Sequence, residues 1–234
     1  MRVLVIDTAL GLCTAGVFEA DGDEALALGV RSESMTRGHS ERLAGMARDA
    51  VAGAGGGFQA LDRIGVTVGP GSFTGLRVGL AFAQGLGAAL GIPVVGLSSL
   101  DALKASVEHA RTVVALIDAR RGQVYGRAWR AGVAVGPAEA WAVDDARAFV
   151  AELETNSPLA ADDRVHLVGS GAALVGEGSG HGVIHPLEGP DPAAMAWLTA
   201  AVDPQAHPPR PLYLRAPDAI PPTRLPGEAR AARS

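Results

Sequence analysis

The chain has very little cysteine and no long apolar run. Cys13 is the single cysteine among 234 residues, which excludes an internal disulfide framework and fits a reducing compartment. No stretch reaches the roughly 18 consecutive apolar residues of a membrane-spanning helix. The apolar run after Met1 is interrupted at Asp7, too early for a secretory signal. We therefore expect a cytoplasmic protein without a membrane span.

Basic residues are not in excess either. The chain has 20 Lys and Arg against 25 Asp and Glu, a net charge of −5, and a pI of about 5.7. A protein whose main ligand is nucleic acid usually carries a basic face, and no arginine cluster dominates here. We therefore expect the chain alone to bind nucleic acid weakly.

Apolar periodicity predicts an α/β first half. Apolar residues alternate with polar ones or form continuous runs in the predicted strands, and they recur at a spacing of three or four residues in the predicted helices. The predicted strands are 3–7, 14–19, 25–31, 64–68 and 93–97, and the predicted helices are 39–53, 74–90 and 98 to about 109. This order is βββαβαβα.

The second half repeats the start of the first. Residues 3–7 (VLVID) and 114–118 (VALID) are both apolar segments that end in Asp, with Gly four residues later. This repeat indicates duplication into two related lobes. Further elements are predicted at 123–129, 144–154, 165–168 and 192–201, and a docking strand at 212–215. We expect a first lobe at 1–102, a second at 103–216, and a disordered Pro/Arg-rich tail at 217–234.

The most informative segment is 69–79, which reads GPGSFTGLRVG between a predicted strand and a predicted helix. It lacks the Lys and Ser/Thr of a P-loop and the third glycine of a dinucleotide fingerprint. It is therefore either a phosphate loop of another kind or a packing device. The glycines of the following helix cost about 1 kcal/mol each relative to Ala, which close approach of another backbone would offset.

This segment, together with Ile6-Asp7-Thr8, 39–43, 117–125 and 211–215, makes the chain similar to the TsaB (YeaZ) family over nearly its whole length. The resemblance implies a duplicated actin-like, sugar-kinase-like ATPase fold with a reduced second lobe. It also implies a non-catalytic role in forming threonylcarbamoyladenosine in tRNA. The implied partners are a TsaD-like catalytic paralogue and a TsaE-like ATPase, with a homodimer when the chain is alone. The alternative is an autonomous small-molecule kinase or ATPase.

Several polar residues are candidates to face a nucleotide. In this fold Asp7 and Asp118 stand where carboxylates hold magnesium and phosphate, although a strand-end Asp can simply cap a turn. The nucleotide-facing candidates are Asp7, Thr8, Ser72 and Thr74. We expect no tightly bound cofactor, and any ATP or ADP to be shared at the complex interface. His181 and His185 have a metal-like spacing, but the surrounding glycines disfavour the helix that a metal site would need.

The first-lobe helices are the expected partner surface. Their apolar stripes fit either an interface or the core, and the resemblance favours the interface. The interface candidates are His39, Leu43, Met46, Ala50, Gly75, Gly79 and Ala83. Residues 169–171 (GSG) are a weak candidate for an adenosine loop. Cys13 is expected to be a buried apolar side chain rather than a nucleophile.

Overall fold

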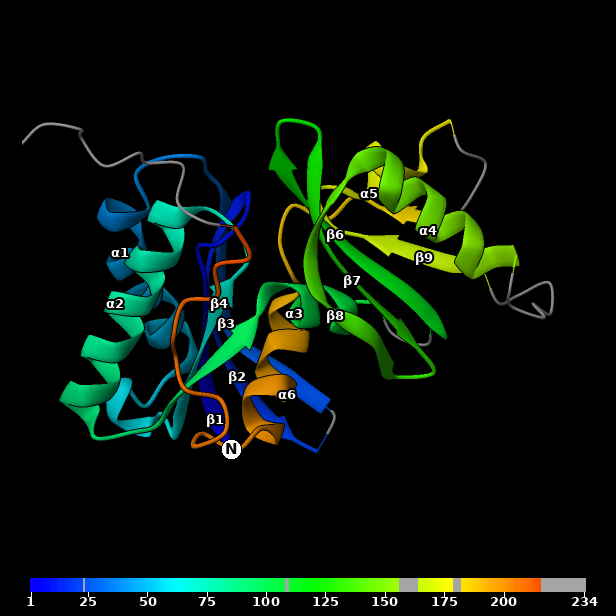
Figure 1. Cartoon of the computed structure of the whole chain (residues 1–234). Helices are drawn as coiled ribbons and strands as arrows, with labels where there is room; N and C mark the ends of the chain where they lie inside the picture. Colours follow the sequence, from blue (N-terminus) through cyan, green and yellow to red (C-terminus); the bar gives the residue numbers. More distant parts are fainter. Residues whose placement is uncertain (23, 108–109, 156–163, 179–181, 216–234) are drawn as a thin grey trace, which may run out of the picture.

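The computed structural model describes all residues except 23, 108–109, 156–163, 179–181 and 216–234. Two five-stranded mixed sheets form two lobes that lie side by side (Figure 1). The first lobe contains β1 (Arg2–Asp7), β2 (Leu12–Asp21), β3 (Glu24–Ser34), α1 (His39–Ala54), η1 (Phe58–Ala60), β4 (Arg63–Gly69), α2 (Phe73–Leu90) and β5 (Val94–Ser98). The remaining elements are α3 (Ser99–Ala105), β6 (Thr112–Arg120), β7 (Gln123–Arg130), β8 (Val133–Ala142), α4 (Val143–Thr155), β9 (Val165–Val168), α5 (Ala172–Gly176), β10 (Val183–His185) and α6 (Pro192–Ala201).

The two sheets have the same topology. The strand orders are β3-β2-β1-β4-β5 and β8-β7-β6-β9-β10, so β1 and β6 are equivalent central strands. Each is antiparallel to the strand that follows it and parallel to the strand on its other side. The predicted repeat of 3–7 and 114–118 is therefore confirmed. The second lobe is reduced, as α5 has 5 residues and β10 has 3.

Helices cover both faces of the first sheet. α1 and α2 pack on one face, where Leu4, Ile6 and Val66 contribute to the core beneath them. α6 packs on the other face against Val3 and Val5. In the second lobe, α4 and α5 cover one face of the sheet, and the other face packs on α3.

α6 corrects the predicted lobe boundary. The range 103–216 assigns this helix to the second lobe, but α6 lies on the first sheet. Arg63 at the start of β4 holds it there, because its guanidinium donates to the carbonyl oxygens at the helix end, those of Thr199, Ala200 and Val202. The chain thus returns to the first lobe after completing the second sheet.

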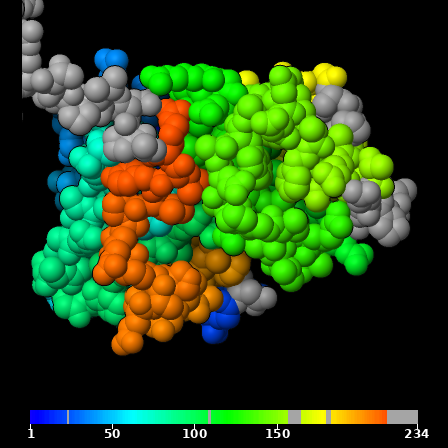
Figure 2. All heavy atoms as spheres, in the orientation of Figure 1, coloured from blue at the N-terminus to red at the C-terminus, as the bar shows by residue number. Residues whose placement is uncertain are grey.

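The segment after α6 runs along the first lobe to the junction with the second. Figure 2 shows residues 203–215, orange to red, on the surface between α2 and the second lobe. Backbone bonds tie it to two strands, from Gly96 N to His207 O and from Leu212 N to Val68 O. The predicted strand at 212–215 is wrong, since these residues form no assigned strand, although Leu212 packs against the first-lobe core. The predicted tail lies outside the described residues.

Two helices differ from what composition or pattern indicates. α3 ends at Ala105 rather than near 109. α2 has the length and apolar composition of a membrane span, the one such helix in the part of the chain that the structure describes. Its glycines and leucines on one side are buried against the first sheet. Packing in the first lobe therefore accounts for part of its apolar composition.

Candidate functional site: the cleft between the lobes

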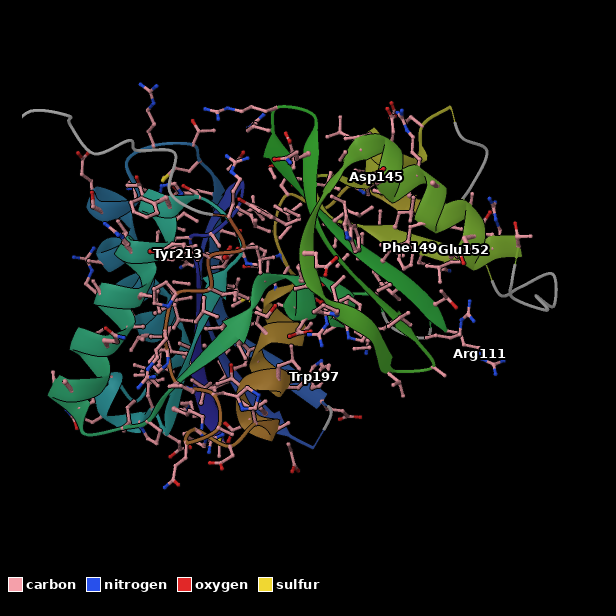
Figure 3. The ribbon with its side chains drawn as sticks, viewed as in Figure 1. Arg111, Asp145, Phe149, Glu152, Trp197 and Tyr213 are labelled. Carbon is pink, nitrogen blue, oxygen red and sulfur yellow. The ribbon has the colours of Figure 1, made fainter. Side chains whose placement is uncertain are left out.

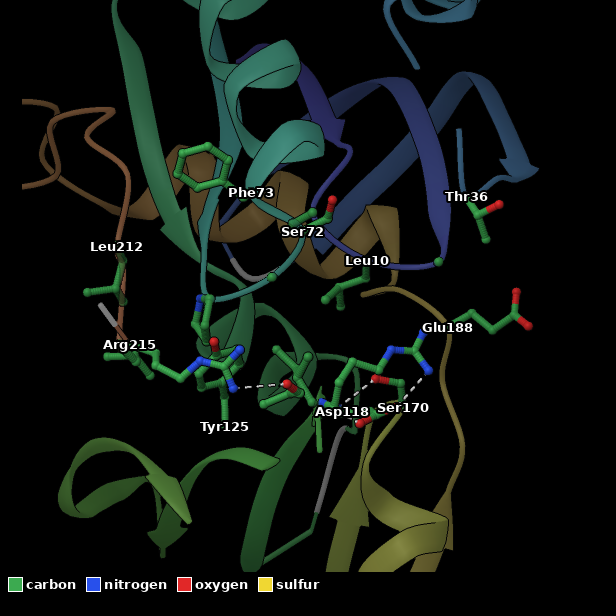
Figure 4. A pocket seen from close by; sticks show the side chains of 18 of the residues that line it. Leu10, Thr36, Ser72, Phe73, Asp118, Tyr125, Ser170, Glu188, Leu212 and Arg215 are labelled. Carbon is green, nitrogen blue, oxygen red and sulfur yellow. Dashed lines mark hydrogen bonds and ion pairs between the residues drawn. The ribbon is translucent and has the colours of Figure 1, made fainter. Parts of the chain in front are cut away.

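A cleft of about 780 Å³ lies where the lobes meet. The first lobe contributes the loop after β1, the end of β3 and the starts of α1 and α2, and the second contributes the β6–β7 hairpin and Ser170. Residues 212–215 close one side (Figure 4). The cleft lies at the strand ends that the sequence repeat predicts, because β1 and β6 both end there.

The glycine-rich segment packs tightly against the loop after β1. A Cβ added at Gly71 or Gly75 would lie closer than 3.0 Å to the carbonyl oxygen of Ala9 or Thr8, a distance that real Cβ atoms essentially never show. The Ser72 amide donates to Ala9 O at 2.7 Å. Glycine is therefore needed so that two backbones can touch, which favours the packing interpretation over a phosphate loop.

Asp7 does not face the cleft. Its side chain is 1% exposed. Its Oδ1 accepts hydrogen bonds from Thr67 Oγ1 at 2.6 Å and from the Ala9 amide at 3.0 Å. Its Oδ2 is buried and has no hydrogen-bond partner among the described residues. Burial raises the pKa of Asp7 above its ordinary value, against the smaller lowering effect of these bonds. The expectation that Asp7 faces a nucleotide is wrong, because the carboxyl group belongs to the interior.

Thr8 and Thr74 also point elsewhere. Thr8 is buried, and its hydroxyl donates to Gly75 O at 2.7 Å, which joins β1 to α2. Thr74 is exposed, but it lines a separate groove between α1 and α2. Thr8 therefore does not face the cleft, whereas the expectation that Thr74 faces a nucleotide stays a prediction. Ser72 does line the cleft, where it caps α2 by accepting from the Gly75 amide.

The second lobe presents Asp118 at the cleft. Its carboxylate accepts from the Arg120 amide at 2.7 Å and forms an ion pair with the Arg120 guanidinium at 3.1 Å. The Asp118 amide donates to Ser170 Oγ (Figure 4). The same carboxylate thus lines the cleft and caps its own turn, as an Asp at a strand end commonly does.

The predicted adenosine-loop candidate is the second-lobe counterpart of the glycine-rich segment. Gly69 ends β4 and Gly169 directly follows β9, and their φ values are 107° and 112°. A Cβ at Gly169 would lie closer than 3.0 Å to Leu116 O, and the Gly171 amide donates to the same oxygen at 2.9 Å. Residues 169–171 therefore pack against β6 in the second lobe. The glycine-rich segment packs in the same way against the residues that follow β1 in the first lobe.

The sequence pattern missed several cleft residues. Tyr125, Glu188 and Arg215 line it. The Arg215 guanidinium donates to Gln123 Oε1, and the carboxylate of Glu188 accepts from Ser34 Oγ at 3.2 Å. Tyr125 and Arg215 lie in segments that carry the family resemblance, so the resemblance could have indicated them as cleft residues. Glu188 follows no motif.

The seven interface candidates are buried in the first lobe itself. His39, Leu43, Met46, Ala50, Gly75, Gly79 and Ala83 are all buried in the single chain. Their burial follows from the packing of the apolar stripes of α1 and α2 on the first sheet, although Leu43 also lines the outer groove between these helices. His39 instead lines the cleft at the start of α1.

The outer side of the same helices carries an apolar groove of about 530 Å³. It is lined by Ser40, Leu43, Ala44, Phe73, Thr74, Arg77, Val78, Ala81 and Phe82. At its edge the Arg77 guanidinium lies 3.8 Å from the centre of the Phe73 ring. Phe73 is 45% exposed. Tyr213, which is labelled in Figure 3, is 42% exposed. The centres of the two rings are 5.5 Å apart.

The remaining candidates are not in the cleft. Cys13 is buried as expected, and burial together with nearby carboxylates raises the pKa of its thiol to about 11. His181 lies outside the described residues. His185 contacts His166 instead, with the ring nitrogens 2.9 Å apart.

Comparison with known proteins places the chain in a family. The family model described as "TsaD: tRNA N6-adenosine threonylcarbamoyltransferase" matches residues 23–159. An uncharacterized protein of Mycobacterium tuberculosis is 37% identical over 94% of both chains. An uncharacterized protein of Mycobacterium leprae is 38% identical over 94% of this chain, which spans 56% of that relative's length. The tRNA threonylcarbamoyladenosine biosynthesis protein TsaB of Escherichia coli is 34% identical over 53% of each chain.

A solved structure agrees over a longer range. YeaZ from Pseudomonas aeruginosa is 25% identical and superposes with a TM-score of 0.71, covering 91% of this chain and 99% of that one. Together with the two equivalent sheets, this confirms the duplicated actin-like α/β fold expected from the sequence.

Proposed function

The chain belongs to the TsaB/YeaZ family, and on this basis we propose that it is a non-catalytic subunit of the machinery that forms threonylcarbamoyladenosine in tRNA. It binds a TsaD-like catalytic paralogue and a TsaE-like ATPase, and it forms a homodimer when alone. It acts in the cytoplasm and meets tRNA only through the complex. Any ATP or ADP is shared with the partners.

The observation that supports a non-catalytic role is that neighbouring residues cover the C-terminal end of β1 and bury its carboxylate. A kinase or ATPase of this fold needs a carboxylate that faces the metal and phosphates. Here Asp7 is buried and hydrogen-bonded to Ala9 and Thr67. The glycine-rich segment packs directly against the backbone that follows Asp7. This arrangement holds the first lobe together at the position where a catalytic relative would bind its substrate.

The partner surface proposed for the TsaD-like paralogue is the groove between α1 and α2. Exposed aromatic and arginine side chains such as Phe73 and Arg77 are typical of the residues that contribute most to protein interfaces. α2 offers a matched pair of exposed alanines, since Ala81 lines the groove and Ala88 does not. We expect Ala81→Asp to weaken binding of the paralogue by about tenfold or more, because it places a charge in a desolvated contact.

Ala88→Asp is the control, and both variants should melt as the wild type does. Binding is measured by calorimetry with the purified paralogue. Equal affinities for Ala81→Asp and Ala88→Asp would show that the partner docks elsewhere.

The function itself is tested by reconstitution. We expect modified tRNA only when this chain is present together with the TsaD-like and TsaE-like proteins. The chain alone should neither modify tRNA nor hydrolyse ATP. Turnover of about 1–10³ s⁻¹ by the isolated chain would instead identify an autonomous ATPase or kinase.

A further inference from the structure

Residues 212–215, here called the connecting segment, contact both lobes within four consecutive positions. The Leu212 amide donates to a backbone carbonyl of β4 at 2.7 Å, and its side chain packs against the first-lobe core. Leu214 packs against the apolar cluster that β6, β7 and α3 form on the second sheet. The Arg215 guanidinium donates to Gln123 Oε1 at 3.2 Å and to a backbone carbonyl of β6 at 3.4 Å. The segment therefore joins the two lobes at the cleft.

The same segment also borders the outer groove between α1 and α2. Its Tyr213 ring lies 5.5 Å from the Phe73 ring, and its hydroxyl oxygen accepts from Arg77 Nε at 3.4 Å. Phe73 and Arg77 line the groove, and Phe73 lines the cleft as well. A ligand that fills the groove therefore contacts the side chains that hold Tyr213 in place.

The connecting segment is held more firmly by the first lobe than by the second. In the first lobe its backbone is hydrogen-bonded to β4, and Leu212 O lies so close to Gly69 that an added Cβ would be 2.7 Å away. In the second lobe the contacts are made by the side chains of Leu214 and Arg215. A partly buried guanidinium exchanges its partners for water at lower cost than a backbone pair packed against a core. The second-lobe contacts are therefore the ones that release first.

A second connection between the lobes lies on the other side of the cleft. The Gly11 amide donates to Glu188 O at 2.9 Å, and Ser34 Oγ donates to the Glu188 carboxylate. Figure 4 shows Glu188 and Arg215 on opposite sides of the cleft. Release of Arg215 therefore frees one side of the cleft while the Glu188 side stays connected, which is the arrangement that a hinged opening needs.

We propose that the connecting segment couples the outer groove to the opening of the cleft. In the closed state Phe73 and Arg77 hold Tyr213, and Arg215 is bonded to the β6–β7 hairpin. In the open state Tyr213 has left Phe73, Arg215 has released the hairpin, and the second lobe has rotated away. A ligand in the groove shifts this equilibrium because it contacts Phe73 and Arg77 differently in the two states. That this ligand is a TsaD-like protein rests on the proposed function, whereas the coupling lies within one chain.

The test uses the full chain without partners and measures the distance between the lobes. α1 and α4 lie on the outer sides of the two lobes (Figure 1). Spin labels are attached at the exposed positions of Arg48→Cys on α1 and Ala148→Cys on α4, and Cys13→Ala in every sample prevents labelling elsewhere. Pulsed dipolar electron paramagnetic resonance then gives the distribution of distances between the labels.

Arg215→Met should raise the ratio of open to closed molecules by about tenfold, as expected for loss of hydrogen bonds from a charged donor. The distance distribution should become longer and broader. Arg210→Met is the matched control, because Arg210 is exposed on the chain just before the connecting segment, and it should leave the distribution unchanged. A wild-type distribution for Arg215→Met, or an equal change in both variants, would overturn the proposal.

Phe73→Ala tests the coupling itself, because it removes the ring beside Tyr213 and leaves Arg215 in place. We expect it to change the distribution in the same direction as Arg215→Met. Ala81→Asp should not, since Ala81 lines the groove about two turns further along α2. If Phe73→Ala has the wild-type distribution, or if Ala81→Asp opens the cleft equally, the groove is not coupled through Tyr213. If Phe73→Ala does not fold, Tyr213→Leu at the neighbouring exposed position takes its place.

The double variant Phe73→Ala/Arg215→Met decides whether the two residues act through one connection. It should be no more open than Arg215→Met alone, because the second change finds the contact already lost. Additive opening would refute a shared connection. A failed reconstitution with partners would leave these distances intact, so the coupling and the proposed function fail separately.

Discussion

Replacing Gly75 with Ala tests whether the glycine-rich segment is a packing device. Gly75 lies in the first turn of α2, directly over the backbone of Thr8. An added Cβ would lie closer than 3.0 Å to Thr8 O and within 3.4 Å of Ser72 Cβ. Because the atom it meets first is a backbone oxygen, relief requires α2 or the end of β1 to move.

The expected magnitude follows from two opposing effects. Forcing an extra carbon into a close-packed site costs about 1–3 kcal/mol, and a rigid backbone neighbour favours the upper end. The gain in helix propensity from Gly to Ala is at most about 1 kcal/mol. Gly75→Ala should therefore lower the free energy of unfolding by about 2 kcal/mol, which for a chain of this length lowers Tm by about 4–8 °C.

The same helix supplies the control. A Cβ at Gly85 would meet nothing within 4 Å, so Gly85→Ala should raise the free energy of unfolding by up to about 1 kcal/mol through propensity alone. Urea denaturation and thermal melting of both variants measure the difference. If Gly75→Ala is as stable as Gly85→Ala, the close contact with Thr8 does not constrain the fold and the packing argument is refuted.

Four further substitutions probe the interior. Met46→Asp and Gly79→Leu should unfold the first lobe rather than weaken an interface, since both positions are buried in the single chain; near-native circular dichroism melting of both would contradict this. Arg63→Met should destabilise the protein by about 2–3 kcal/mol in urea, because three carbonyl groups at the end of α6 lose a charged donor; an unchanged midpoint would show that water replaces the guanidinium. Asp7 has a raised pKa in the folded state, so it binds its proton more tightly there and its contribution to stability falls as pH rises above the unfolded value of about 4. Asp7→Asn should remove this dependence, and parallel pH–stability curves for variant and wild type would argue against a buried carboxyl.

The order of elements followed from the sequence alone. The helix at 192–201 and the strand at 165–168 have the predicted bounds, and the repeat of 3–7 in 114–118 correctly indicated two lobes built on β1 and β6. These features are local, because a periodicity of two or 3.6 residues and a capping residue act over a few neighbouring positions.

What covers each apolar face was decided only by the tertiary structure. The stripe containing Leu43 and Met46 is equally compatible with a core and with an interface, since periodicity shows that a face is apolar but not what it contacts. The same holds for Asp7, which becomes an interior group only because Thr67 and Ala9 fold against it. The cleft likewise joins Ser72, Asp118 and Arg215, which are brought together by long-range packing that no local pattern encodes.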